Sequence, residues 1–127
     1  MDALRKVLAD DPCVSYALVF GSSARGTAHE GSDLDIAVGL ESPARLSALE
    51  LGDLIARLER ASGRSVDIVV VDEAPPAVAY RIFRDGHVIV EKNHRTLVEH
   101  KTRAIIEYLD FPARQKPSAR TARRARS

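Results

Sequence analysis

The sequence predicts a single α/β domain in which a small sheet of about four strands is flanked by helices. Two observations lead to this prediction. Segments of helical and strand-like pattern alternate along the chain with short links between them. The chain has 127 residues, 45% of them hydrophobic, which is enough to form the core of one globular domain. No internal repeat is visible, so we expect one structural unit.

The first 40 residues predict a helix followed by two strands. Residues 2–10 are expected to form a short helix, which Asp11-Pro12 ends because proline cannot continue it. Residues 14–20 are rich in β-forming side chains and stop at Gly21. Residues 33–40 form the second predicted strand.

A longer helix is expected within residues 42–63. Ser42 would be its N-cap, Pro43 its first helical residue, and Gly63 the glycine that ends it. Several of its leucines fall near one stripe, which we expect to face the core: Leu46, Leu49, Leu54 and Leu58.

The second half of the chain continues the alternation. Residues 65–72 predict a third strand, and residues 75–86 a helix closed by a glycine. A fourth strand is expected at 87–91, and a long last helix at 94–109.

The charge of the chain is strongly asymmetric. Residues 1–110 hold 13 basic and 18 acidic residues, a formal charge of −5, whereas the last 17 residues hold six basic residues and no acidic one. We therefore expect a folded domain over residues 1–112 and a basic, disordered tail over residues 113–127. Such a tail either only aids solubility or contacts nucleic acid or an acidic partner, and the sequence leaves these alternatives open.

Targeting and redox features indicate a cytoplasmic protein. No apolar run is long enough to cross a bilayer, and the first residues lack the apolar core of a signal peptide. The single cysteine, Cys13, cannot form an internal disulfide. We expect no membrane contact.

Two short motifs at neighbouring strand ends predict a nucleotide site. Asp33 and Asp35 alternate along a strand, so both carboxylates project from one face, where they suit a hard cation such as Mg²⁺. Gly21-Ser22 ends the preceding strand, and a helix starting over Ser22–Arg25 would offer free N–H groups to phosphate. Each motif alone is common, and their combination favours one shared site.

Residues 21–35 match a known signature without a gap. Gly21-Ser22, ten intervening residues and Asp33-x-Asp35 resemble the motif of the nucleotidyltransferase superfamily related to DNA polymerase beta. The segments SVDIVVVD, RIFRDGHVIVEK and IIEYLDF are similar in order and character to minimal nucleotidyltransferase (MNT) antitoxins that are paired with HEPN-domain toxins. The likeness covers roughly residues 1–112 and implies the minimal nucleotidyltransferase fold, with a small mixed sheet.

The resemblance implies a protein adenylyltransferase. Such antitoxins move AMP from ATP to a tyrosine of the cognate HEPN ribonuclease and so neutralise it, with Mg²⁺ as cofactor. The family needs a third carboxylate, which maps to Asp67. It would be a metal ligand together with Asp33 and Asp35 and could also accept the proton of the tyrosine. Asp72, at the end of the same strand, is the other candidate, although we expect it to cap the helix that starts at Pro75 or to be solvated. Ser22 would donate to a phosphate, and Arg25 would contact phosphate or form an ion pair.

Two other functions stay open from the sequence. One is a non-enzymatic antitoxin that only binds and occludes its toxin, and the other is a small-molecule nucleotidyltransferase. The remaining polar candidates are expected to be structural: His100 has no partner at zinc-ligand spacing and is interpreted as an ordinary surface or helix-end residue, and Tyr16 as a packing residue.

Overall fold

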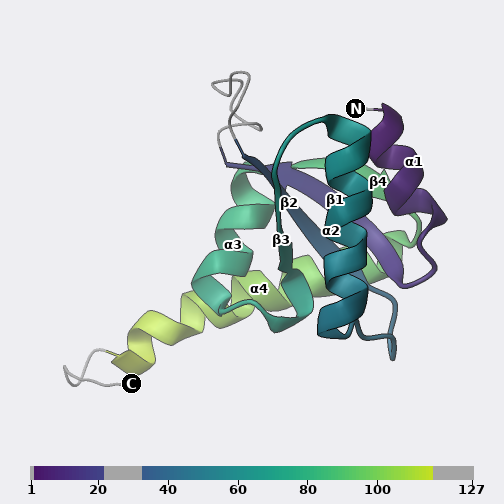
Figure 1. The fold of residues 1–127 in the computed structure, drawn as a ribbon. Coiled ribbons are helices and arrows are strands. Elements are labelled where there is room, and N and C mark those ends of the chain that lie inside the picture. The colour runs from purple at the N-terminus through teal and green to yellow at the C-terminus, as the bar shows by residue number, and fades with distance from the viewer. Residues whose placement is uncertain (1, 22–32, 116–127) are drawn as a thin grey trace.

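Four helices and four strands alternate along residues 2–21 and 33–115, which are the residues that the computed structural model describes (Figure 1). This confirms the predicted fold class. The elements, with a short 3-10 helix η1, are α1 (Asp2–Asp10), β1 (Val14–Phe20), β2 (Leu34–Leu40), α2 (Ala48–Ser62), β3 (Val66–Val70), η1 (Val71–Glu73), α3 (Pro76–Asp85), β4 (His87–Glu91) and α4 (His94–Gln115).

The four strands form one mixed sheet in the order β3-β2-β1-β4. β1 is antiparallel to both β2 and β4, whereas β2 and β3 are parallel and are joined through α2. Because of these directions, the last residue of β1 and the first residues of β2 and β3 meet at one end of the sheet. The predicted motif residues belong to this end.

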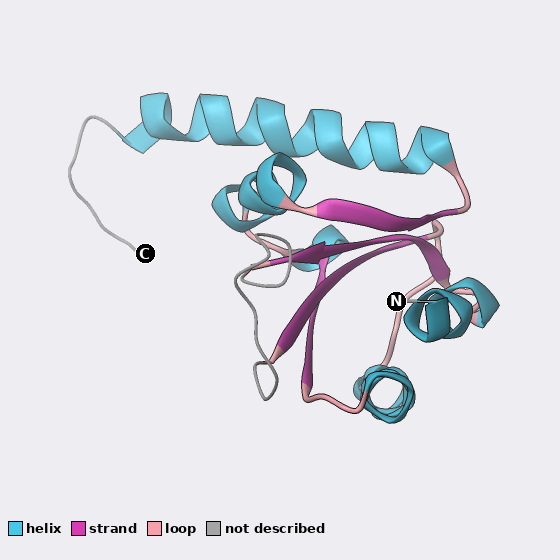
Figure 2. Ribbon diagram, turned by 90° about the horizontal axis from the view of Figure 1, so that it is seen from above, coloured by secondary structure: helices cyan, strands magenta, loops and turns pink. Residues whose placement is uncertain are grey.

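Helices cover both faces of the sheet. α1 and α2 lie on one face, and α3 and α4 lie on the other (Figure 2). Alternate strand residues supply the two cores, since successive side chains of a strand point to opposite faces. The α1/α2 core includes Leu4, Leu8, Ile36, Val38, Leu54 and Leu58. The α3/α4 core includes Tyr16, Leu18, Ala37, Ala79, Ile82 and Leu97.

The start of α2 differs from the prediction. Its N-cap is Ser47 rather than Ser42: the Ser47 hydroxyl accepts from the Glu50 N–H at 3.1 Å, and the Glu50 carboxylate accepts from the Ser47 N–H at 2.9 Å. This reciprocal capping box satisfies two backbone donors, whereas Ser42 and Pro43 precede the helix in the link from β2. Gly63 ends α2 in the left-handed conformation, as predicted.

The predicted leucine stripe of α2 is only partly correct. Leu54 and Leu58 are fully buried, but Leu49 is 84% exposed. Leu54 and Leu58 are four residues apart and share a face, whereas a spacing of five residues turns Leu49 about 140° away from Leu54.

α4 is longer than predicted. It continues past position 109 and past the expected domain boundary at 112, and it ends at Gln115. Most of the expected tail, residues 116–127, lies outside the described residues, so its proposed role stays a prediction.

A buried polar chain joins α4 to the sheet. Tyr16 of β1 is fully buried, and its Oη lies 2.7 Å from Nδ1 of His100 on α4. A Cβ at Gly39 would come within 2.0 Å of the Tyr16 ring, so the missing side chain at Gly39 makes room for this tyrosine. His100 is therefore not the ordinary surface residue that the sequence suggested, because its side chain is only 11% exposed.

Asp72 completes this chain at the end of β3. Its Oδ1 accepts the Leu40 N–H at 3.1 Å, and its Oδ2 lies 3.7 Å from Nε2 of His100. The expectation that Asp72 caps α3 is wrong, since the N-cap position is Pro75 and carries no side-chain cap.

Candidate functional site

Three carboxylates meet at one end of the sheet. Asp35 is the register partner of Asp67 on β3 and of Phe20 on β1, and Asp33 directly precedes β2. Residues in register on neighbouring strands project to the same face, and the period of two places Asp33 on that face as well. This is the face that α3 and α4 cover, since Ala37 of β2 belongs to their core.

Gly21 lies against this group. It has a φ of 72°, and a Cβ on it would lie 2.4 Å from Oδ2 of Asp35. Only glycine combines this backbone conformation with so close an approach. The sequence-predicted pairing of Gly21 with the Asp-x-Asp strand is therefore a direct contact in the structure.

The charges of the three carboxylates act on one another. Asp33 and Asp67 are exposed, and Asp35 is half-buried between them. Burial, followed by the negative charges of Asp67 and Asp33, raises the pKa of Asp35 above its ordinary value. A cation placed here would relieve this repulsion, so the group is suited to bind positive charge.

The oxygen atoms of the three aspartates are suited to bind a cation that is also bound by a substrate. Within the described part of the chain, no group of three or more His, Cys, Asp or Glu side chains is arranged to hold a metal ion by itself. Mg²⁺ is usually bound by one or two carboxylates together with substrate phosphates rather than by a protein cage. Asp33, Asp35 and Asp67 offer oxygen ligands of this kind.

Asp72 lies away from the carboxylate group. It follows β3 at the far end, five residues after Asp67, which corresponds to roughly 15 Å along an extended strand. Of the two candidates for a third carboxylate, Asp67 is the one beside Asp35. The proposed phosphate-binding residues Ser22 and Arg25 lie outside the described residues.

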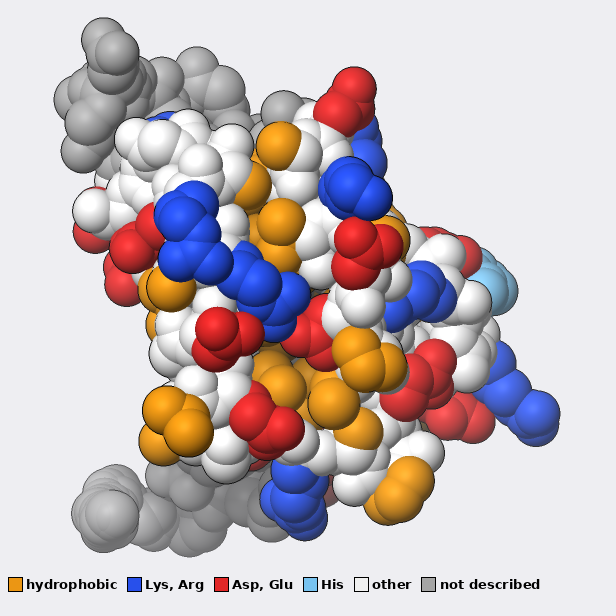
Figure 3. All heavy atoms as spheres, turned by 45° about the vertical axis from the view of Figure 1, so that its right-hand side comes forward, with side chains coloured by type: hydrophobic (Ala, Val, Ile, Leu, Met, Phe, Trp, Pro, Cys, Tyr) orange, Lys and Arg blue, Asp and Glu red, His pale blue; other side chains and the backbone are white. Residues whose placement is uncertain are grey.

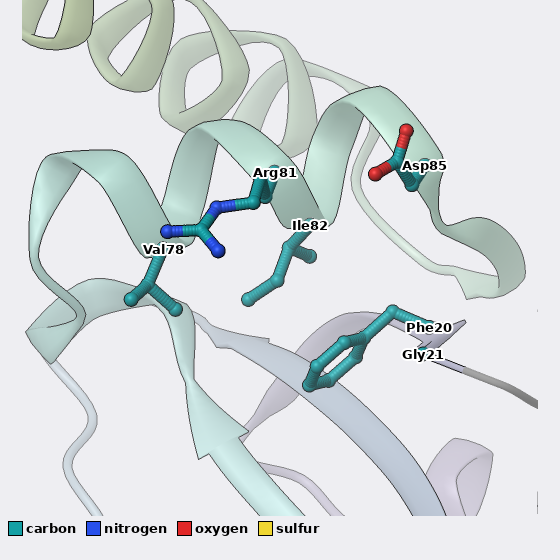
Figure 4. A pocket seen from close by; sticks show the side chains of 6 residues that line it. All are labelled: Phe20, Gly21, Val78, Arg81, Ile82 and Asp85. Carbon is teal, nitrogen blue, oxygen red and sulfur yellow. The ribbon is translucent and has the colours of Figure 1, made fainter.

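A cavity of about 180 Å³ lies between α3 and the end of β1 (Figure 4), and its lining includes Gly21, which approaches Asp35. Its lining residues are Phe20, Gly21, Val78, Arg81, Ile82 and Asp85. The sequence interpretation missed this cavity, although the four residues from α3 recur at the i, i+3, i+4, i+7 spacing of one helix face. That spacing shows a shared face but not what the face packs against.

A mixed sheet with three carboxylates and a close glycine turn at one end defines an α/β protein with an acidic candidate site. Residues 2–95 match the protein family described as polymerase beta nucleotidyltransferase, and the chain belongs to this family. A structure described as a minimal nucleotidyltransferase is 34% identical over 68% of this chain and 85% of its own, with a TM-score of 0.57.

Two further solved structures share the fold over most of the chain. One, described as a toxin–antitoxin with AMP-PNP, is 24% identical, covers 91% of both chains and has a TM-score of 0.79. The other, a tri-AMPylated Shewanella oneidensis HEPN toxin in complex with an MNT antitoxin, is 21% identical, covers 91% of this chain and 88% of its own, and has a TM-score of 0.73. No curated protein sequence matches the chain.

No helix in the described part of the chain is both long enough and apolar enough to span a membrane.

Proposed function

We propose that the protein is an antitoxin that acts as a Mg²⁺-dependent protein adenylyltransferase. It transfers AMP from ATP to a tyrosine of a cognate HEPN ribonuclease toxin and so neutralises the toxin in the cytoplasm. The single observation that carries the proposal is the register of Asp35 with Asp67, beside the close contact of Gly21, in a member of the nucleotidyltransferase family.

The structural likenesses support the choice of partner and nucleotide. Toxin–antitoxin complexes share the fold over 91% of this chain, one of them with AMP-PNP and another with a tri-AMPylated HEPN toxin. AMP-PNP is an analogue of ATP, and an AMPylated toxin is the product that the proposed reaction would give.

Each residue of the site would have a distinct role in the reaction. Asp33 and Asp35 would hold Mg²⁺ together with the triphosphate, and Asp67 would accept the proton of the attacking tyrosine hydroxyl. A bound Mg²⁺ would neutralise charge that develops on the phosphates and lower the pKa of the hydroxyl. The absence of a side chain at Gly21 would leave Asp35 free to reach the metal.

The reaction is balanced as a direct displacement. The tyrosine oxygen bonds to the α-phosphorus of ATP, the bond between this phosphorus and the bridging oxygen breaks, and pyrophosphate leaves. The hydroxyl proton goes to the carboxylate of Asp67. Positioning and electrostatics would supply most of the acceleration, because phosphoryl-type transfer needs little covalent help from the protein. In the same proposal, Ser22 and Arg25 contact the phosphates.

The experiment is transfer of labelled AMP to the HEPN protein encoded by the neighbouring gene. We expect Asp33→Asn and Asp35→Asn to lower transfer at least about a hundredfold, because each removes a metal ligand. Asp10→Asn is a matched control: this exposed carboxylate ends α1 on the opposite face and, among the described residues, pairs only with Lys6, at 3.4 Å. Near-normal transfer by both site variants, with folded protein verified by circular dichroism, would exclude the proposed site.

A further inference from the structure

Gly21 lines the cavity between α3 and the end of β1 and also approaches Asp35, one of the three clustered carboxylates. Phe20 is the register partner of Asp35, and both side chains lie on the face that α3 covers. Side chains directly opposite each other on antiparallel strands have Cβ atoms about 4.5–5.5 Å apart. A ligand whose phosphates lie at Asp35 can therefore place an attached group against Phe20.

The size and lining of the cavity limit what that group can be. At about 180 Å³ it is smaller than the roughly 300–1,000 Å³ of a pocket for a whole drug-sized ligand, so it holds one part of a ligand. Most of the lining is apolar, from Phe20, Val78 and Ile82. Figure 4 shows Val78, Arg81 and Ile82 projecting from α3, with Phe20 below them on β1.

The two charged lining residues differ in their partners. Asp85 is held by Arg84, whose Nε and Nη2 each donate to it at 2.9 Å. Arg81 is exposed and forms no hydrogen bond or ion pair with any residue in the described ranges 2–21 and 33–115. The cavity therefore combines an aromatic ring with a guanidinium that is available to a ligand.

From this combination we infer that the cavity binds the base of the nucleotide between the ring of Phe20 and the guanidinium of Arg81. Every base presents a flat π-face, which stacks on aromatic rings and attracts the planar guanidinium of arginine. The inference rests on the proposed function, because it assumes that the carboxylate group holds nucleotide phosphates. The inference places the base of that nucleotide, which is the end away from the phosphates, in the cavity.

The test compares two ligands, since only one of them has a base. Mg·ATP and Mg·tripolyphosphate are titrated by calorimetry into the isolated full-length protein and its variants. We expect Arg81→Ala and Phe20→Leu to weaken ATP binding about tenfold or more and to leave tripolyphosphate binding unchanged. Arg60→Ala, which removes an exposed arginine from α2 on the other face of the sheet, should change neither affinity.

The outcomes separate this inference from the proposed function. Unchanged ATP affinity in Arg81→Ala would overturn the inference, because within the ranges 2–21 and 33–115 Arg81 has no hydrogen-bond or ion-pair partner whose loss could disturb folding. An equal loss for both ligands would overturn it too, because Arg81 would then contact phosphate and not the base. If the wild-type protein binds neither ligand, the proposed function itself fails.

Discussion

At the scale of single residues, Gly21 has a more specific role than its place in a motif suggests. A glycine at a strand end lets the backbone approach another group closely. The structure adds that the carboxylate of Asp35 lies where a Cβ would stand. The glycine and the aspartate fourteen positions later are therefore one local arrangement, and the spacing of the motif places them in contact.

The roles of Asp67 and Asp72 can be separated by two substitutions. Asp67→Ala should lower AMP transfer by about 10²–10⁴-fold with little change in the free energy of unfolding, because Asp67 is exposed. Asp72→Ala should keep transfer but lower the free energy of unfolding by about 1–3 kcal/mol, because the Leu40 N–H loses its acceptor. Transfer assays and urea denaturation measure both effects. The reverse pattern would show that Asp72, and not Asp67, completes the site.

The pKa of Asp35 predicts a pH dependence in metal-free protein. Because this pKa is raised above 3.8 on folding, the folded state holds the proton more tightly than the unfolded chain does. The free energy of unfolding should thus decrease as the pH rises from about 4 through the raised pKa. Asp35→Asn removes the titrating carboxyl, so the free energy of unfolding of this variant should not show that decrease.

Denaturation in the presence of a chelator checks the expectation. At neutral pH, Asp35→Asn should be more stable than the wild-type protein, and the difference should shrink as the pH falls towards 4. A wild-type protein that is the more stable of the two at neutral pH, without metal, would show that burial and the neighbouring carboxylates together do not disfavour the charged form of Asp35.

At the scale of the elements, α4 is fixed to the sheet through His100. Asp72 faces Nε2 of His100 and favours the proton on that nitrogen, so Nδ1 accepts from the Tyr16 hydroxyl. Burial lowers the pKa of His100, and the charge of Asp72 opposes this effect. Burial also raises the pKa of Tyr16, so its hydroxyl stays protonated and can donate. Three further charged groups act on the imidazole: Arg103, Glu99 and Glu41.

This lowered pKa predicts a loss of stability in mild acid. The folded state binds the His100 proton less tightly than the unfolded chain, so the free energy of unfolding should fall as the pH drops below about 6.5. His100→Gln should reduce this pH dependence between pH 7 and 5. An unchanged pH dependence in His100→Gln would contradict the buried role of His100.

Local signals predicted most elements, and long-range contacts explain the differences. The strands and α1 follow from β-forming segments and Pro12, but the helix predicted within residues 42–63 has Ser47 as its N-cap and not the predicted Ser42. The Glu50 that completes the capping box favours Ser47. The roles of His100 and Arg81 depend on what α4 and α3 pack against. The spacing of side chains along one helix does not show which element that helix packs against.

At the scale of the whole molecule, the candidate site lies on one of the two faces of the sheet. Acidic and basic side chains are interspersed over the face of α1 and α2, with hydrophobic side chains between them (Figure 3). The three carboxylates of Asp33, Asp35 and Asp67 and the cavity beside Phe20 lie on the face that α3 and α4 cover. The motif allowed the sequence to predict the carboxylates, whereas the cavity depends on the packing of α3 onto the sheet and could not be predicted.

The central claim is covalent modification of a toxin, and the mass of the toxin after separation from this protein tests it most directly. The HEPN protein is incubated with the wild-type protein, ATP and Mg²⁺, then purified away and assayed for ribonuclease activity. We predict a mass increase of one or more AMP units on a tyrosine and a loss of ribonuclease activity that persists after separation. Asp33→Asn should give neither. An unchanged mass with full recovery of ribonuclease activity would contradict the account and show an antitoxin that acts by binding alone.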